Sequence, residues 1–357
     1  MHIPVASFQL PLSNLLSEDS KSVLKHRAIE SRNLIRTSPP PEVSWDLRRA
    51  SIEEIPKIRK AMAKLCISSP AYSRLSNRYK TKMQLEMMAG VCTEVFTPAY
   101  GVSDKNKDRA LINLHGGYLM YGSRSQSHFE SIPISAVGKI KVISVDYRMA
   151  PEHHFPAASD DVLSVYKHLL KDYEAKNIGI YGSSAGALLA AQVIARIQRE
   201  GLPMPAAVGM LSAAVYYWME GDSGVIGSAI MGTPEEVSGF ERDLYFKNVS
   251  LSNSEAFPGN DPETIRTFPP SLLLSSTRDF CLSSVVKTHT ELTKLGVSAD
   301  LHVWEGLDHV FYLDVDIPES AEVYDVVTGF FDNHFGEERS AGEGGSAPDA
   351  ITQQESP

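Results

Sequence analysis

Residues 178–191 read IGIYGSSAGALLAA, and this stretch frames the interpretation of the whole chain. It opens with alternating apolar residues and closes with good helix formers, a pattern that predicts a strand turning sharply into a helix. At the turn, residues 182–186 read GSSAG, the pattern G-x-S-x-G. Two interpretations follow. Either Ser184 is a nucleophile, or the small residues serve only a tight turn in which larger side chains would collide with the backbone.

The segments around this stretch alternate between strand-like and helix-like character from about residue 91 to residue 335. Apolar, β-branched runs predict strands at 91–97, 110–114, 141–146, 178–181, 207–212, 272–275 and 299–304. Helical periodicity appears at 161–173, 185–200, 283–295 and 319–335. Such an alternation predicts the α/β class, with a mostly parallel central sheet flanked by helices. We assign this core to 91–213 and 269–336.

Two regions fall outside the alternation. Residues 1–90 look mainly helical, and SIEE at 51–54 has the pattern of a capping box that opens a helix toward Cys66, although Pro56 disturbs the first turn. Residues 214–268 are too long for an ordinary connection. They are rich in aromatic residues, namely Tyr216, Tyr217, Trp218, Phe240, Tyr245 and Phe246. We expect both regions to form a cap over one edge of the sheet, and the alternative is a simple packing extension.

Composition restricts the class of function. The chain has 357 residues, of which 43% are apolar, and a net charge of −10, so it can bury a full core and nucleic acid is not an expected partner. Its cysteines lack the number and spacing of a disulfide framework or a zinc site, which fits a reducing compartment. They are Cys66, Cys92 and Cys281. Residues 337–357 are acidic and poor in large apolar side chains, so we expect a disordered tail.

The chain shows no targeting or membrane signal that we recognise. Its first residues lack the basic region of a signal peptide, and no run approaches the ~18 apolar residues that a membrane-spanning helix needs. We therefore expect a cytoplasmic protein without a membrane span.

Two residues downstream suit a nucleophile at Ser184. A serine hydroxyl needs an imidazole to accept its proton, and the imidazole needs an acid to orient it. In hydrolases that carry G-x-S-x-G at a strand-to-helix turn, the acid and then the histidine follow, each after a strand. Asp279 and His309 each follow a predicted strand, in this order. Asp308 is a poorer candidate for the acid because it adjoins the histidine in sequence.

The oxyanion of acyl transfer needs preorganised backbone N–H groups. Ala185 follows the serine and begins a helix, whose dipole adds to the effect of its N–H. We expect further donors in HGGY at 115–118, directly after a predicted strand, with Gly117 and Tyr118 as donors and Gly116 shaping the turn. Because a glycine-rich loop, a serine turn, an acid and a histidine follow one another in the required order, we prefer the nucleophile interpretation.

Three segments carry a resemblance to a known family: HGGYLMYGS at 115–123, DYRMAPEHHFPAA at 146–158 and GSSAG at 182–186. They resemble the hormone-sensitive-lipase-like esterases of the α/β-hydrolase fold, and within that family the branch of the monoterpene lactone hydrolases. The resemblance spans residues 90–335. It implies an α/β-hydrolase fold with a mainly helical cap, and a reaction that needs neither a metal nor an organic cofactor.

The resemblance also implies roles for individual residues. Those that match the family's catalytic triad are Ser184, Asp279 and His309. Those that match its oxyanion region are Gly116, Gly117 and Ala185. Those that match positions bracing the loops are His115, Asp146, Arg148 and Glu152.

Two positions depart from the family pattern. Tyr118 stands where a third glycine is usual, and its ring would narrow the acyl pocket. Its backbone can still donate, but a positive φ would be costly for a tyrosine. Ser183 stands where many relatives have Asp, which affects local bracing and the pH profile. We expect the substrate pocket to be lined by Tyr118, Ser183, Tyr216, Tyr217 and Trp218.

The main hypothesis is a serine carboxylesterase or lactone hydrolase that forms an acyl-enzyme on Ser184. The alternative is a biosynthetic enzyme of secondary metabolism that performs thioester release, lactonisation, acyl transfer or cyclisation at the same site. A third hypothesis is a non-catalytic ligand-binding protein, which the complete triad disfavours. The expected ligand is an apolar ester, lactone or thioester. The resemblance leaves a homodimer through the last strand, at 301–304, open.

Overall fold

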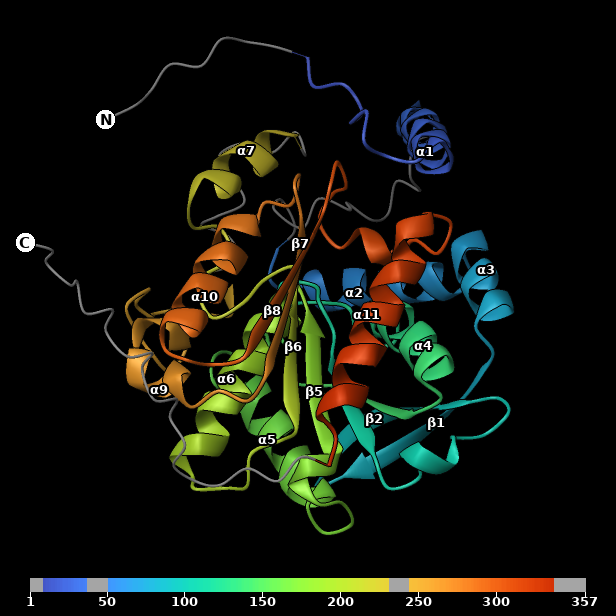
Figure 1. The fold of residues 1–357 in the computed structure, drawn as a ribbon. Helices are drawn as coiled ribbons and strands as arrows, with labels where there is room; N and C mark the ends of the chain where they lie inside the picture. Colours follow the sequence, from blue (N-terminus) through green and yellow to red (C-terminus); the bar gives the residue numbers. More distant parts are fainter. Residues whose placement is uncertain (1–8, 37–50, 231–243, 337–357) are drawn as a thin grey trace, which may run out of the picture.

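The computed structural model describes residues 9–36, 51–230 and 244–336. An eight-stranded sheet runs through the middle of this part of the chain (Figure 1). The strand order is β1-β2-β4-β3-β5-β6-β7-β8. β2 runs antiparallel to β1 and β4, and the other neighbours are parallel. The strands are β1 Thr81–Met88, β2 Val91–Pro98, β3 Ala110–Leu114, β4 Lys141–Val145, β5 Ile178–Ser183, β6 Ala207–Leu211, β7 Ser271–Ser276 and β8 Ala299–Trp304.

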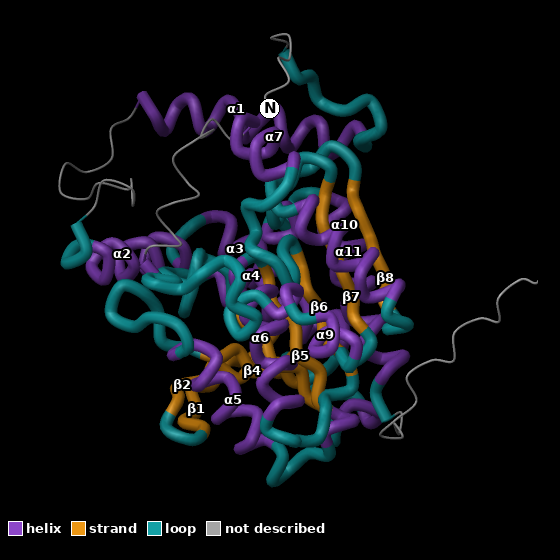
Figure 2. The backbone as a smooth tube through the Cα atoms, turned by 90° about the vertical axis from the view of Figure 1, so that its left-hand side faces the viewer, coloured by secondary structure: helices purple, strands orange, loops and turns teal. Residues whose placement is uncertain are grey.

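Helices cover both faces of this sheet, as Figure 1 and Figure 2 show. The helices on one face are α5 Ala157–Leu169, α6 Ala185–Arg199 and α10 Leu282–Lys294. Those on the other face are α4 Gln126–Gly138 and α11 Pro318–His334. The amino-terminal helices are α1 Glu18–Arg36, α2 Ile55–Ile67 and α3 Pro70–Arg78. Within the described part of 214–268, the helices are α7 Asp222–Ile230 and α9 Pro262–Arg266.

The alternation of side chains along each strand divides the core into two parts. In β3, Ala110, Ile112 and Leu114 join the cluster under α5 and α6, whereas Leu111 joins the cluster under α4 and α11. All of β3 is buried. Strands that are covered on both faces are apolar at consecutive positions, which is why the sequence shows them as continuous apolar runs.

The chain changes its direction of winding at β3. β4 pairs with one edge of β3, and β5 pairs with the other. In the pairing with β5, Leu114 at the end of β3 lies opposite Gly182 near the end of β5. In open α/β sheets, the loops diverge at such a point and leave a crevice for a ligand. The fold therefore brings the loop after β3 and the turn after β5 side by side.

The α/β class predicted from the sequence is confirmed, and every expected strand is present. Two further elements were not anticipated. β1 is almost wholly exposed at the edge of the sheet, so it lacks the apolar run of a buried strand. α4 contains Pro133 and buried serines, so its helical periodicity is weak. The helix expected at 161–173 also begins earlier, at Ala157.

The amino-terminal segment needs a correction. Helices account for much of its described part, but β1 lies inside the expected range 1–90 and pairs with β2 along its whole length. The boundary at residue 90 therefore divides a hairpin, and the sheet begins at Thr81. α2 begins at Ile55, and the Ser51 N–H donates to Glu54 Oε2 at 2.8 Å. Of the two hydrogen bonds of a capping box, the one from the backbone N–H to the glutamate carboxylate is therefore present, and it lies just before the helix begins.

The expected cap regions pack against the core. α3 contacts α4, α1 contacts α11, and α7 contacts α10. In both views α1 and α7 lie at the same end of the molecule (Figure 1, Figure 2). Phe240 and the tail expected at 337–357 fall outside the described residues. None of the helices that the structure describes is long and apolar enough to cross a membrane.

Leu75 on α3 is fully buried in the cluster under α4 and α11. Leu75→Ala is expected to lower the free energy of unfolding by about 2–5 kcal/mol, because it removes buried methyl groups and leaves a cavity. Urea denaturation measures this change. The control is Leu65→Ala on α2, where the side chain is 53% exposed and a change within about 0.5 kcal/mol is expected. Equally small effects in both variants would mean that α3 does not share the folding unit of the core.

Candidate active site

Ser184 lies at the turn from β5 into α6. Its φ of 54° and ψ of −125° form a combination that costs on the order of 1–3 kcal/mol for a residue with a side chain. Its N–H donates to the Leu211 carbonyl at 2.7 Å, which ties the turn to β6. The backbone leaves no room nearby, since a Cβ on Gly186 would lie 1.9 Å from the Leu114 carbonyl oxygen. The small residues of GSSAG therefore meet a packing requirement and hold the serine at the end of the sheet.

His309 and Asp279 lie beside this serine. His309 Nε2 is 2.9 Å from Ser184 Oγ, and His309 Nδ1 is 2.7 Å from Asp279 Oδ1. The carboxylate is buried and also accepts hydrogen bonds from Ser275 Oγ at 2.9 Å and the Cys281 N–H at 2.8 Å. An Nδ1–H held by this carboxylate leaves Nε2 as the basic nitrogen facing the serine. The structure thus brings together the three side chains that the sequence singled out.

Other groups around His309 take different places. Asp308 adjoins it in the chain, but the imidazole Nδ1 is bonded to Asp279. The Phe280 ring packs on the imidazole with centroids 4.2 Å apart. Among the described residues, the ligand atoms of Asp279, Cys281 and His309 lie within 4.8 Å of one another and form one group that could hold a metal ion. A cation there would compete with the hydrogen bonds that align the serine, the imidazole and the carboxylate.

The loop at 115–118, called the oxyanion loop below, approaches Ser184 from β3. Gly117 has φ 107° and Tyr118 has φ 56°, so the tyrosine adopts the left-handed region. That region costs a residue with a Cβ roughly 1–2 kcal/mol. A Cβ on Gly117 would lie 2.2 Å from the Tyr121 carbonyl oxygen, which explains this glycine.

Gly116 does not fit the oxyanion region to which the resemblance assigned it. Its N–H donates to Glu130 Oε1 at 3.0 Å, so this donor is already used by the core. The absence of a side chain has another reason, because a Cβ there would lie 2.3 Å from Gln126 Nε2 and 3.2 Å from Ser184 Cβ. The remaining candidate donors are the N–H groups of Gly117, Tyr118 and Ala185.

A cavity of about 310 Å³ opens at the turn. The described residues that line it are Gly117, Tyr118, Tyr121, Gln126, Ser184, Ile230, Asp308, His309 and Val310. Of the expected pocket residues, only Tyr118 is among them. Ser183 is fully buried, and Tyr216, Tyr217 and Trp218 are buried in the core. Trp218 packs on the Tyr118 ring with centroids 6.4 Å apart. Aromatic residues after β6 therefore form a support behind the pocket, and aromatic content alone does not distinguish a pocket from a core.

A second cavity of about 440 Å³ adjoins the first. The residues that line both are Tyr121, Gln126, Asp308, His309 and Val310. The rest of its wall is mainly apolar and includes Leu24 of α1, Met62 of α2 and Phe129 of α4. The amino-terminal helices therefore contribute directly to the space beside the imidazole.

The four residues matched to loop-bracing positions each hold another part of the chain. These residues are His115, Asp146, Arg148 and Glu152. His115 stacks on the Tyr147 ring, and Asp146 accepts a hydrogen bond from the Ser123 hydroxyl. Arg148 forms an ion pair with Asp161, and Glu152 forms one with Arg59. Burial lowers the pKa of the His115 imidazole. None of the four lines the cavity at the turn.

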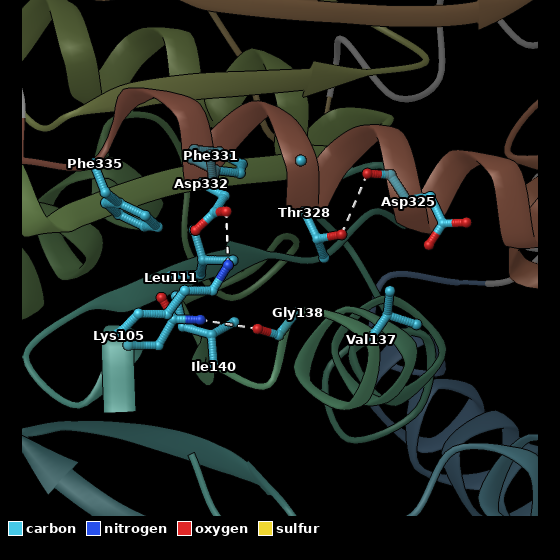
Figure 3. Close-up of a pocket in the computed structure, with 12 residues that line it drawn as sticks. Lys105, Leu111, Val137, Gly138, Ile140, Asp325, Thr328, Phe331, Asp332 and Phe335 are labelled. Carbon is cyan, nitrogen blue, oxygen red and sulfur yellow. Dashed lines mark hydrogen bonds and ion pairs between the residues drawn. The ribbon is translucent and has the colours of Figure 1, made fainter. Parts of the chain in front are cut away.

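Figure 3 shows a separate cavity of about 170 Å³. It lies near the amino end of β3 and the carboxyl ends of α4 and α11, away from the turn after β5. Its wall comes from the loop before β3, from α4 and from α11. The Lys105 ammonium is paired with the Asp332 carboxylate at 2.7 Å. The residues that line this cavity are not those of the cavities beside Ser184, so we assign it no part in the chemistry of that site.

The sequence did not single out a buried carboxyl group beneath the oxyanion loop. Glu130 on α4 is 3% exposed and accepts hydrogen bonds from the Gly116 N–H, Asn113 Nδ2 and Gln126 Nε2 at 3.0, 3.0 and 2.9 Å. Burial raises the pKa of Glu130 to about 7, and these hydrogen bonds oppose that shift. No short motif signals this residue, because its partners lie on β3, in the loop and on its own helix.

Comparison with known proteins shows the family to which the fold belongs. A family model described as alpha/beta hydrolase fold matches residues 111–313. That match covers more than half of the chain, and the chain belongs to the alpha/beta hydrolase fold family. A crystal structure of an esterase superposes with a TM-score of 0.80 and 27% identity, over 94% of this chain and 99% of that one. A crystal structure of an esterase from the bacterial hormone-sensitive lipase family gives a TM-score of 0.73 at 23% identity, over 90% of this chain and 99% of that one, a likeness of fold.

Relatives of known activity match over part of their length. The carboxylesterase/phospholipase LipF of Mycobacterium tuberculosis is 28% identical over 220 residues, which are 59% of this chain and 58% of LipF. The acetyl-hydrolase of Streptomyces hygroscopicus is 27% identical over 235 residues, 64% of this chain and 77% of that protein. The chain thus spans less than two thirds of LipF. These two relatives are named for ester hydrolysis. The resemblance to hormone-sensitive-lipase-like esterases and the branch of the monoterpene lactone hydrolases stay predictions.

Two buried carboxyl groups are expected to give opposite pH dependence of stability. Glu130 has a pKa of about 7 when folded, against 4.5 as its ordinary value, so its contribution is largest at low pH and falls as the pH rises from about 4.5 to about 7. Between pH 5 and pH 8, wild type should lose about 2–3 kcal/mol of unfolding free energy relative to Glu130→Gln. Urea denaturation at both pH values measures the difference.

Glu94 provides the control. It is desolvated, but its hydrogen bond with His128 and the charge of that imidazole hold the pKa of Glu94 below its ordinary value. Its stabilising contribution is therefore present above pH 4.5 and lost as the pH falls through its folded pKa. Wild type should lose unfolding free energy relative to Glu94→Gln as the pH falls below 4.5, which is the direction opposite to that expected for Glu130. The same trend in both variants would contradict the assignment of the raised pKa to Glu130.

Proposed function

We propose that the protein is a serine hydrolase that cleaves carboxylic esters or lactones of apolar small molecules through an acyl-enzyme on Ser184. The observation that carries this proposal is the hydrogen-bonded series from Ser184 Oγ to His309 at 2.9 Å and from His309 to Asp279 at 2.7 Å, at the wall of a cavity. The activities named for the relatives, a carboxylesterase and an acetyl-hydrolase, support ester hydrolysis as the reaction class.

Acylation begins when His309 Nε2 accepts the hydroxyl proton of Ser184 and Oγ attacks the carbonyl carbon. Asp279 holds the imidazole through Nδ1 and stabilises the imidazolium. Because this carboxylate is buried, water screens the pair little and the stabilisation is stronger than at a surface. The imidazolium then gives its proton to the leaving alkoxide. Water, activated by the same imidazole, hydrolyses the acyl-enzyme and releases the acid.

The proposed oxyanion donors are the N–H groups of Gly117, Tyr118 and Ala185. The oxyanion loop is preorganised, because the Gly117 carbonyl accepts hydrogen bonds from the N–H groups of Met120 and Tyr121 at 2.9 and 3.0 Å. Ala185 is the first residue of α6, so the amino end of that helix adds its dipole. Donors that are fixed before the reaction stabilise the developing charge without reorganising, and each contributes about 10²–10³ in rate.

The cavities indicate a substrate larger than a simple acetate ester. Two adjoining spaces of about 310 and 440 Å³ share the wall beside the imidazole, within the range of small-molecule sites. The first is limited by the Tyr118 ring. The second has a mainly apolar wall, with Leu24, Met62 and Phe129, which favours an apolar substituent.

We propose that the amino-terminal segment and residues 214–268 act together as the cap of this site. Leu24 and Met62 come from α1 and α2, and Ile230 ends α7. Since both segments reach the cavity walls, they would select substrates by shape. A cytoplasmic location also stays a prediction, as does a homodimer through β8, whose outer edge has no partner strand in the described sheet.

Ser184→Ala is expected to abolish the chemistry while leaving the fold intact. Its kcat for p-nitrophenyl acetate should fall by about 10⁴-fold or more, and a fluorophosphonate probe should label wild type but not the variant. Steady-state kinetics and intact-protein mass spectrometry measure the two effects. Ser183→Ala is the matched control, since its buried neighbouring hydroxyl is no nucleophile and labelling should persist. Ester turnover by pure Ser184→Ala protein would contradict the proposal.

Tyr118→Gly is expected to widen the substrate range. The change removes the ring from the cavity and the cost of a positive φ, but it keeps the backbone N–H. The ratio of kcat/KM for a bulky branched p-nitrophenyl ester to that for the acetate should rise about tenfold or more, the scale of one methylene in a hydrophobic pocket. Tyr118→Phe retains the ring and should leave the ratio unchanged. An unchanged ratio in Tyr118→Gly would show that the ring does not set the acyl size.

A further inference from the structure

We propose that Glu130 is a positioning residue for the oxyanion loop, because its carboxylate holds the Gly116 N–H and so fixes how Gly117 and Tyr118 present their N–H groups to the reacting carbonyl. This inference rests on the proposed hydrolase function, in which those N–H groups bind the oxyanion. Glu130 itself does not line the cavity at Ser184. It acts on the substrate only through the backbone.

The hydrogen bonds around Glu130 fit an ionised carboxylate. Oε1 accepts from the Gly116 N–H and from Gln126 Nε2, and Oε2 accepts from Asn113 Nδ2. Asn113 is itself oriented, because its Oδ1 accepts from Ser144 Oγ at 2.8 Å. All three partners of the carboxylate are therefore donors. A carboxylate only accepts, whereas a protonated acid would direct its own hydrogen at one of these donors.

The contact with Gly116 reaches the reacting groups through rigid peptide units. A peptide is planar, so fixing the Gly116 N–H fixes the plane that begins the oxyanion loop. The next residue, Gly117, is held from its other side by the hydrogen bonds of its carbonyl with Met120 and Tyr121. The two sets of hydrogen bonds leave the loop little freedom to turn. Gln126, which lines both cavities, joins Glu130 to the wall of the site.

The surroundings of Glu130 supply hydrogen bonds but no opposite charge. Among the described residues, no Lys, Arg or His side chain forms an ion pair with it. The titratable groups that face it are Tyr147 after β4, Tyr181 on β5 and Tyr312 in the turn after β8. Burial raises the pKa of each tyrosine, so these stay neutral at working pH. Nearby, Glu94 and His128 pair with each other, and burial favours neutral His115.

Ionisation of Glu130 should therefore appear in catalysis. Its pKa is about 7, so near neutral pH the carboxylate loses its acceptor-only state as the pH falls. Protonation of Glu130 places a hydrogen on a carboxyl group that faces three donors, and this weakens its hydrogen bond with the Gly116 N–H. We expect kcat to fall as the pH is lowered because Glu130 becomes protonated.

Glu130→Gln tests the proposal, with Glu94→Gln as the matched control. Both variants replace a buried carboxyl group, but the described hydrogen bonds of Glu94 join it to His128 and Ser127 and not to the oxyanion loop. In Glu130→Gln, kcat for p-nitrophenyl acetate should fall about 10–100-fold with KM within about twofold, and the ionisation near pH 7 should leave the kcat profile. Amide hydrogen exchange of residues 114–121 should be faster than in wild type. Glu94→Gln should show none of these changes.

A second variant covers the case in which Glu130→Gln does not fold. Glu130→Asp keeps the charge but is one methylene too short to reach Gly116, so it should lose kcat, exchange faster in 114–121 and retain an acid-side ionisation. Unchanged kcat or unchanged exchange in the folded variants would overturn the positioning role. If wild type shows no Ser184-dependent turnover, the proposed function fails. In that case, unchanged amide hydrogen exchange in the Glu130 variants would still overturn the proposal that Glu130 fixes the oxyanion loop. Faster exchange would support it.

Discussion

The constraint on which this site depends is that no side chain fits between the turn after β5 and the end of β3. A Cβ on Gly186 would lie 1.9 Å from the Leu114 carbonyl oxygen, and one on Gly116, after β3, would lie 3.0 Å from the Ser183 carbonyl oxygen. The two strands are neighbours at a topological switch point, so their loops meet only if both backbones are bare there. This contact sets Ser184 against the oxyanion loop and points the amino end of α6 at the same spot. The strained φ of the serine persists because the surrounding sheet over-determines it.

Two buried carboxyl groups near the serine serve different ends because their partners differ. Asp279 faces an imidazole that gains a charge in the proposed reaction, and it also accepts from a hydroxyl and a backbone N–H. Glu130 faces only neutral donors, so burial prevails and its pKa is raised to about 7. The first group stabilises a charge that appears on the imidazolium. The second stabilises the position of a backbone segment. Environment, more than residue type, assigns such roles.

The sequence predicted what depends on local pattern and order along the chain. Buried strands appear as apolar runs, and because the strands are parallel, residues that follow them gather at one end of the sheet. The places of Ser184, Asp279 and His309 could therefore be foreseen. What could not be foreseen depends on tertiary contacts. β1 gains its place by pairing with β2 although its side chains are exposed, and α4 buries serines and Glu130 that look like surface residues in the sequence. The part of the pocket wall that comes from α1 and α2 also depends on tertiary contacts, so it could not be predicted either.

Tyr118 has two properties that bear on the site, one in its ring and one in its backbone. Its ring borders the cavity beside Ser184 and packs on Trp218, which is buried. Its N–H is a candidate oxyanion donor, and its φ of 56° is one that glycine adopts at little cost and tyrosine does not. A substrate that moves this residue, and does not only rotate its ring, would also move the N–H that it presents. In the proposed reaction, selectivity would then arise in the rate of the chemical step as well as in binding.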